Sequence, residues 1–247
     1  MRHRSPRDAV LQGLILLALP LCWPSAARAD EKAELLAAFN QAQTLERKGE
    51  IPAAARSYQR ALDLAPRVFG PEHPNTAVIL NNLGNLYVDL GQYAQAEPLH
   101  LRSLQIRRSQ LGPNHPDVAV TLYNLANLYN DMGQYAKAEP LYLESLKIKE
   151  SRLRPNHLEV AACLNNLGNL YKDMGQYAKA EPLYQRSLKI RESRLGPDHL
   201  DVAASLNNLA ILYDEMGQYA RALPLFQRSL KIKESRLGPN HPTWRTA

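Results

Sequence analysis

Hydrophobic and polar residues alternate along most of the chain with the period of an α-helix. One apolar series has the i, i+3, i+4, i+7 spacing that places side chains on one face of a helix. Its members are Leu80, Leu83, Gly84 and Tyr87. A second series begins near Tyr93, and Gly91 lies between the two. Because glycine ends a helix at little cost, the pattern predicts a hairpin of two helices.

This hairpin is a repeating unit. The segment that begins at Leu80 returns at Leu122, Leu164 and Leu206, a constant step of 42 residues, and a divergent copy covers residues 35–66. A fixed step of this length is typical of stacked supersecondary units. We expect five hairpins in residues 30–237. The repeats start near residues 35, 77, 119, 161 and 203, and residues 238–247 form an incomplete sixth repeat or a tail.

The amino-acid pattern of the repeat resembles that of a known family. Leucine, then glycine or alanine, then tyrosine on the first helix, followed by Gly-x-Tyr-x-x-Ala on the second, resembles the tetratricopeptide repeat. The 42-residue unit is similar to the repeats of kinesin light chain and its bacterial relatives. The resemblance implies an all-α solenoid of five helical hairpins that forms a right-handed superhelix, with the first helices lining its concave surface. This fold is a general binding scaffold.

Residues 1–29 do not fit the repeat. Three arginines within the first seven residues precede an apolar run at 10–21, and small residues follow at 27–29. This layout predicts a secretory signal peptide that is cut after Ala29, and hence a periplasmic or secreted protein. The alternative is an uncleaved membrane anchor, although the run is shorter than the about 20 residues of a membrane-spanning helix. A lipoprotein site at Cys22 is disfavoured because Leu21 precedes it.

The net charge and the cysteine content argue against nucleic acid binding and against disulfide bonds. The formal net charge is +6, and without residues 1–29, which hold four arginines and one aspartate, it is +3. This modest excess does not indicate nucleic acid binding. Cys163 is then the only thiol, so no intramolecular disulfide can form. Its apolar neighbours favour a packed small residue over a nucleophile.

The sequence shows no catalytic or cofactor motif. A glycine-rich phosphate loop, an HExxH motif and a nucleophile elbow are all missing, so we expect neither an enzyme nor a cofactor. Five histidines recur at the repeat step: His73, His115, His157, His199 and His241. Helices that pack 8–10 Å apart hold these residues too far apart to share a metal ion. Loop packing or helix capping is the better interpretation.

Charged residues also recur from one repeat to the next. Single acidic residues occur at Asp89, Asp131, Asp173 and Asp214, as is typical of solvated helix ends. Basic residues recur late in the second helices, at Arg107, Lys147, Lys149, Lys189, Arg191, Lys231 and Lys233. Two interpretations remain open for the basic set: a solvated face that complements the helix carboxyl ends, or a groove for acidic partners.

Asparagines form the candidate binding site. They lie on the side of each first helix that faces away from its leucines, and carboxamides both donate to and accept from a peptide backbone. Asparagine also lowers helix propensity, so its recurrence needs a reason. The predicted groove consists of Asn81, Asn82, Asn85, Tyr123, Asn124, Asn127, Asn130, Asn165, Asn166, Asn169, Lys172, Asn207 and Asn208. The alternative is that some amides, particularly Asn82 and its equivalents, bridge neighbouring repeats. The last repeat carries Ile211 instead of asparagine at the position of Asn169.

The predicted function is a non-catalytic scaffold that binds a protein or peptide in this groove. A second hypothesis is self-association through the last repeat, which lacks a polar capping element. In that case the end around Leu225, Phe226 and Leu230 meets another copy or a partner, or Trp244 folds back over it. A membrane is a partner only if the leader is retained.

Overall fold

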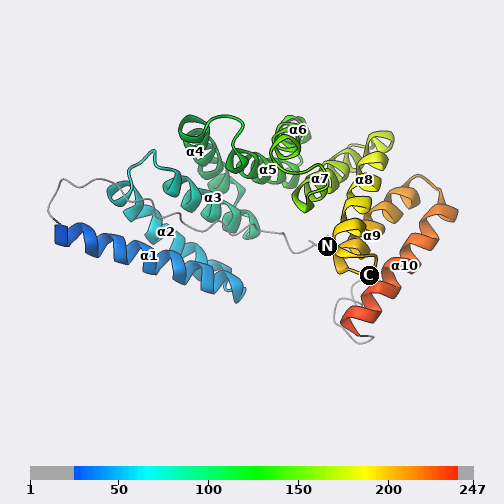
Figure 1. Ribbon diagram of the computed structural model, residues 1–247, viewed down its shortest axis with the longest axis horizontal. Helices are drawn as coiled ribbons and strands as arrows, with labels where there is room; N and C mark the ends of the chain where they lie inside the picture. The colour runs from blue at the N-terminus through cyan, green and yellow to red at the C-terminus, as the bar shows by residue number, and fades with distance from the viewer. Residues whose placement is uncertain (1–24, 239–247) are drawn as a thin grey trace. The chain divides into compact units, whose positions relative to one another are not determined.

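The computed structural model describes residues 25–238, with side chains from residue 29 onward, and all regular structure in that range is helical (Figure 1). The described helices follow one another as the repeat predicts, which confirms the all-α repeat fold. They are α1 (Ser25–Arg47), α2 (Ile51–Val68), α3 (Pro74–Asp89), α4 (Tyr93–Leu111), α5 (Pro116–Asp131), α6 (Tyr135–Arg152), α7 (Leu158–Asp173), α8 (Tyr177–Leu195), α9 (Leu200–Glu215) and α10 (Tyr219–Leu237).

The described helices form two compact units, α1–α5 and α6–α10, which divide after Gln134 inside the third sequence repeat. In the first unit, each of α1 to α4 packs against the helix that follows it. In the second unit, the same holds for α6 to α9. The predicted leader and tail lie almost entirely outside the described residues. None of the described helices is both long and apolar enough to cross a membrane.

The predicted break between the two helices of a repeat is a glycine-ended turn. Gly91 has a φ of 72°, in the left-handed region that L side chains rarely adopt. The Gly91 N–H donates to the Val88 carbonyl at 2.9 Å, and the Gln92 N–H donates to the Tyr87 carbonyl at 2.8 Å. These paired bonds satisfy carbonyls that the end of α3 would otherwise leave open. The corresponding glycines at 133, 175 and 217 have φ values of 72°, 71° and 71°.

In two of the hairpins, close packing depends on a glycine in the first helix. A Cβ added to Gly84 would lie 2.8 Å from Cε1 of His100, and one added to Gly168 would lie 2.9 Å from Cε1 of Tyr184. Both rings are fully buried. At both glycines, an aromatic ring of the second helix therefore occupies the space that a Cβ would need.

Cys163 is packed in the interior of the second unit. Its side chain is fully buried, and Sγ donates to the carbonyl of Tyr142 at 3.6 Å. Burial raises the pKa of the thiol to about 11, so the nucleophilic thiolate is disfavoured at neutral pH. This confirms the interpretation of Cys163 as a packed small residue.

Candidate functional site

Neighbouring first helices are joined through their asparagines. In the first unit, Asn124 Nδ2 of α5 donates to Asn81 Oδ1 of α3 at 3.2 Å. In the second unit, Asn208 Nδ2 of α9 donates to Asn165 Oδ1 of α7 at 3.0 Å. Both bonds link residues that are 43 positions apart. Part of the asparagine column therefore bridges repeats, as the alternative interpretation proposed.

Three of the predicted groove residues are buried. Asn81, Asn82 and Asn165 expose 0%, 6% and 7% of their surface. Asn82 Nδ2 also donates to the hydroxyl of Tyr58 in the preceding repeat at 3.4 Å. The expectation that these three side chains face a ligand is corrected by this burial. They point away from the core of their own hairpin, but the neighbouring repeat covers that side.

The other ten predicted residues are half-buried. They are Asn85, Tyr123, Asn124, Asn127, Asn130, Asn166, Asn169, Lys172, Asn207 and Asn208. Among them, Asn169 Oδ1 accepts a hydrogen bond from the Tyr184 hydroxyl at 2.6 Å. Burial raises the pKa of that hydroxyl far above its usual range, so it remains a donor. Within the described part of the chain, the side chains of Asn85 and Asn207 make no hydrogen bond.

Lys172 is the one cation among the predicted groove residues, and it is held by two carboxylates. Its Nζ lies 2.9 Å from Oδ1 of Asp173 and 3.4 Å from Oε1 of Glu215 in the next first helix. Burial by itself lowers the pKa of Lys172, but these hydrogen bonds and charges together raise it above its usual value. The ammonium stays charged and is neutralised locally, so it bridges α7 and α9.

Two of the recurrent basic residues are buried, which corrects the expectation of a wholly solvated face. Arg107 is fully buried, and its Nη1 donates at 2.8 Å both to the Asp117 carbonyl and to Thr121 Oγ1 in α5. Lys149 exposes 5% of its surface, and its Nζ lies 3.5 Å from Oε2 of Glu159. Long side chains at this position reach from a second helix to the next repeat.

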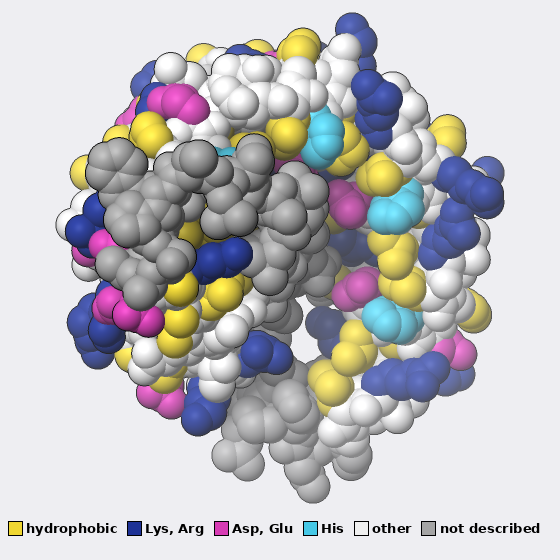
Figure 2. All heavy atoms as spheres, turned by 60° about the vertical axis from the view of Figure 1, so that its left-hand side comes forward, with side chains coloured by type: hydrophobic (Ala, Val, Ile, Leu, Met, Phe, Trp, Pro, Cys, Tyr) yellow, Lys and Arg dark blue, Asp and Glu magenta, His cyan; other side chains and the backbone are white. Residues whose placement is uncertain are grey.

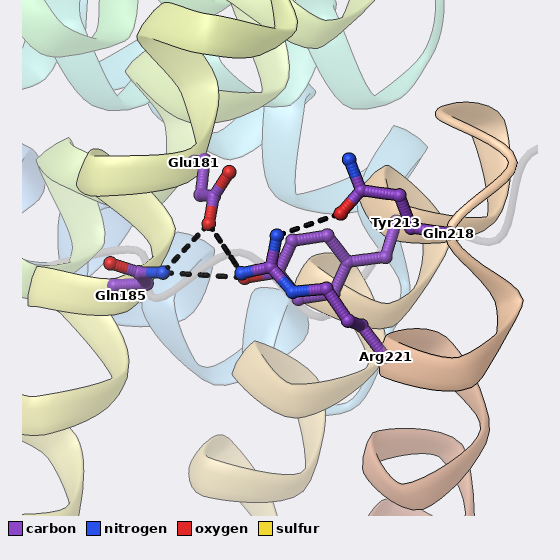
Figure 3. A network of polar contacts seen from close by, with 5 residues as sticks. All are labelled: Glu181, Gln185, Tyr213, Gln218 and Arg221. Atoms are coloured by element: carbon purple, nitrogen blue, oxygen red, sulfur yellow. Dashed lines mark hydrogen bonds and ion pairs between the residues drawn. The ribbon is translucent and has the colours of Figure 1, made fainter.

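A tyrosine–glutamate contact between repeats was missed at the sequence level (Figure 3). The Tyr213 hydroxyl of α9 donates to Oε1 of Glu181 in α8 at 2.8 Å. Arg221 of α10 donates to the same oxygen at 2.7 Å, and its guanidinium lies 3.8 Å from the centre of the Tyr213 ring. The 42-residue recurrence of both residue types was visible in the sequence. Their pairing was not, because 32 residues separate them. Equivalent bonds of 2.7 Å join Tyr129 to Glu97 and Tyr171 to Glu139.

The recurrent histidines cap the first helices. The Nδ1 atoms of His73, His115, His157 and His199 accept from the backbone N–H two residues later, at 3.1 to 3.2 Å. Histidine side chains (cyan) are visible at the surface in Figure 2. These bonds confirm the capping interpretation for the described histidines, and His241 lies outside the described residues. Among residues 25–238, no three His, Cys, Asp or Glu side chains group to hold a metal ion.

Comparison with known families agrees with this geometry. The model of the tetratricopeptide repeat matches the chain in four overlapping segments, residues 34–109, 79–151, 117–193 and 159–235. The chain belongs to the tetratricopeptide repeat family. Its matched segments span nearly all of the described helices. No curated protein matches the sequence significantly.

Several solved structures share the fold of this tetratricopeptide repeat protein. A putative kinesin light chain with nearly identical repeats from Podospora anserina has a TM-score of 0.70 and 22% identity, over 86% of this chain and 98% of its own. BtubC (BKLC) from P. vanneervenii has a TM-score of 0.71 and 22% identity, over 87% and 92%. A Rap protein complexed with competence and sporulation factor has a TM-score of 0.69 and 16% identity, over 81% and 54%. The resemblance to kinesin light chain repeats is thereby confirmed for the fold.

Proposed function

We propose that this protein is a non-catalytic scaffold that binds an extended segment of a partner protein along its first helices. The observation that carries the proposal is that the first helices of each unit carry half-buried polar side chains, among which those of Asn85 in the first unit and Asn207 in the second make no hydrogen bond to a described residue. Membership of a repeat family that commonly acts in protein interactions supports it. So does the similar Rap protein, whose structure was determined in complex with a factor.

The chemistry of carboxamides indicates the form of the ligand. Each amide offers donors and an acceptor without charge, which matches the N–H and C=O groups of a peptide backbone in extended form. One such hydrogen bond contributes about 1 kcal/mol, so useful affinity needs several along the ligand. Recurrence of the same amide at each repeat supplies such a series. Selectivity then depends on the side chains beside the amides, such as Tyr123.

The test replaces two amides with a residue that the chain itself uses at this position. Asn85 and Asn127 correspond to Ile211 in α9, so the double variant Asn85→Ile, Asn127→Ile introduces a side chain that this helix face accommodates. Asn169 is left unchanged because it accepts a hydrogen bond from the buried Tyr184 hydroxyl. Extended peptides selected on the wild-type protein by display are the probe, and their affinity is measured by calorimetry.

The matched control changes two amides on the second helices. Gln59→Leu and Gln227→Leu place leucine where α4 and α6 already carry Leu101 and Leu143. We expect the asparagine variant to lose affinity on the order of 30-fold, and the control to keep it. Equal affinities for the wild type and the asparagine variant would refute binding along the first helices.

We also propose that the protein is exported, with residues 1–29 removed as a signal peptide. The basic start, the short apolar run and the small residues before Asp30 support this proposal. Amino-terminal sequencing of the protein from the cell envelope is expected to begin at Asp30. A protein that begins at residue 1 would instead indicate a retained leader.

A second candidate function is self-association through α10. Leu223 takes the position at which earlier repeats carry a glutamate that bonds to the next repeat, and it is 59% exposed. Tyr219 and Leu230 on the same helix are 67% and 46% exposed. Among the described helices, α10 packs mainly against α9, and an exposed apolar stripe of this kind favours association.

Measurement of molecular mass in solution distinguishes self-association from peptide binding. Self-association predicts that light scattering over a concentration series shows oligomers of the wild type, and that Leu223→Glu shifts them to monomer. The asparagine double variant is then expected to oligomerise as the wild type does. A monomer at all concentrations would remove this candidate and leave peptide binding untouched.

A further inference from the structure

Charge is divided between the two helix types of the second unit. The second helices α6, α8 and α10 carry fourteen lysines and arginines against six glutamates. The first helices α7 and α9 carry one lysine against five carboxylates. The positive charge of this unit therefore lies on its second helices, away from the candidate peptide-binding surface.

At the centre of this positive charge lies one lysine per repeat. Lys147, Lys189 and Lys231 occupy the same position of α6, α8 and α10, and all three are exposed. None of their side chains makes an ion pair or hydrogen bond with a described residue. The residues four positions before and four positions after each lysine are uncharged. They are Leu143 and Ser151 in α6, Gln185 and Ser193 in α8, and Gln227 and Ser235 in α10.

Carboxylates near this lysine row are neutralised by arginines. Glu150 Oε1 of α6 lies 2.6 Å from Arg186 Nη1 of α8, and Glu192 Oε1 of α8 lies 2.7 Å from Arg228 Nη1 of α10. Each pair also links the second helices of consecutive repeats. The lysine row thus keeps a net positive charge, because two of the four glutamates that lie three positions from these lysines are already compensated by arginines.

We propose that the lysine row, Lys147, Lys189 and Lys231, is a docking surface for the headgroups of anionic phospholipids. Protein interfaces are depleted in lysine and rely on tyrosine, tryptophan and arginine. Lysines near an anionic lipid surface, in contrast, each strengthen binding without a fixed geometry. Leu143, 46% exposed and one turn from Lys147, adds an apolar group of the kind that enters the headgroup boundary.

The first unit supplies an internal contrast. At the position of the lysine row, α4 carries Gln105 and α2 carries Asp63. Glutamine at this position is therefore compatible with the fold of a repeat. The docking surface is independent of the asparagines of the first helices, and a protein docked through it keeps those asparagines for its partner.

The primary experiment maps lysine accessibility on vesicles. The full chain is acylated with an amine-reactive reagent in the presence of vesicles of phosphatidylcholine, with or without phosphatidylglycerol, and each lysine is followed by mass spectrometry. We expect Lys147, Lys189 and Lys231 to lose acylation only with phosphatidylglycerol, and to regain it at high salt. Lys32 and Lys48 in the first unit are expected to react equally throughout. This readout is independent of any anchoring by the apolar segment before residue 25.

Variants provide the second measurement. The triple change Lys147→Gln, Lys189→Gln, Lys231→Gln is compared with Lys32→Gln, Lys48→Gln, Arg56→Gln, which removes the same charge from exposed positions of α1, of α2 and of the turn between them. Phosphatidylglycerol is expected to raise the affinity of the protein for vesicles. We expect this gain to fall on the order of 100-fold in the first variant only. Equal loss in both variants, unchanged acylation of the lysine row, or protection by polyglutamate or DNA but not by vesicles would overturn the proposal.

Discussion

The buried Arg107 allows a sharp test of what holds consecutive repeats together. Its guanidinium donates two hydrogen bonds of 2.8 Å to α5, and the whole side chain is buried. Burial lowers the pKa of Arg107 to about 10, against the opposing effect of the Asp117 charge. The charged form is thus disfavoured in the folded state. Burial of Arg107 therefore lowers the stability of the fold, while its hydrogen bonds raise it.

The cost of burying the Arg107 charge and the gain from its hydrogen bonds are of similar size. A pKa drop of this extent corresponds to about 3 kcal/mol of lost solvation for the charge. Two hydrogen bonds from a charged donor contribute about 1.5 to 3 kcal/mol each, which offsets that loss. The stabilisation that remains comes from packing of the side-chain stem. We therefore expect Arg107→Met to lower the free energy of unfolding by about 1 kcal/mol, and Arg107→Ala, which leaves a cavity, by about 3 kcal/mol.

Thr121 ensures that neither variant of Arg107 leaves the Asp117 carbonyl without a hydrogen-bond donor. Its hydroxyl also donates to the Asp117 carbonyl at 3.2 Å, so that carbonyl keeps a donor in both variants. The assay is equilibrium urea unfolding followed by circular dichroism, with amide exchange in α4 and α5 as a local measure because repeat arrays unfold in parts. The half-buried Arg191, which makes the equivalent bonds to Asp201 and Ser205, is the control and should show smaller effects. A methionine variant as unstable as the alanine variant would refute this reasoning.

Three further predictions concern helix ends and close packing. His157→Ala removes a cap and should cost about 1 kcal/mol in urea unfolding, whereas His157→Asn should cost little; equal losses would exclude capping as the cause. Burial lowers the pKa of His73, so the unfolded chain binds a proton at higher pH than the folded chain does. Stability should therefore rise with pH from the folded-state pKa up to about 6.5, and His73→Asn should flatten this part of a thermal unfolding series; an unchanged slope would contradict the assignment. Gly168→Ala should lower the Tm, with a cost of about 1 kcal/mol, because its Cβ would lie 2.9 Å from the Tyr184 ring; a raised Tm, as helix propensity alone predicts, would show that the ring yields.

Local features of the chain were predictable because their physics is local. The helix period, the glycine that ends α3 and the capping role of His73 each depend on residues within a few positions of one another. The contacts of Glu181 and Arg107 were not predictable, because their partners belong to the next repeat. A recurring residue type shows that a contact repeats, but it does not show which second column completes it.

The sequence by itself determined that this protein is an all-helical repeat protein of the tetratricopeptide type, with polar first helices. Only the tertiary structure decided which polar residues are covered. Helical periodicity places Asn81 and Asn85 on the side of α3 away from its leucines, yet Asn81 is fully buried while Asn85 stays half-exposed. The reason is that periodicity describes a side chain relative to its own helix axis. Burial depends on the neighbouring repeat, whose position is set by packing between helices far apart in the chain.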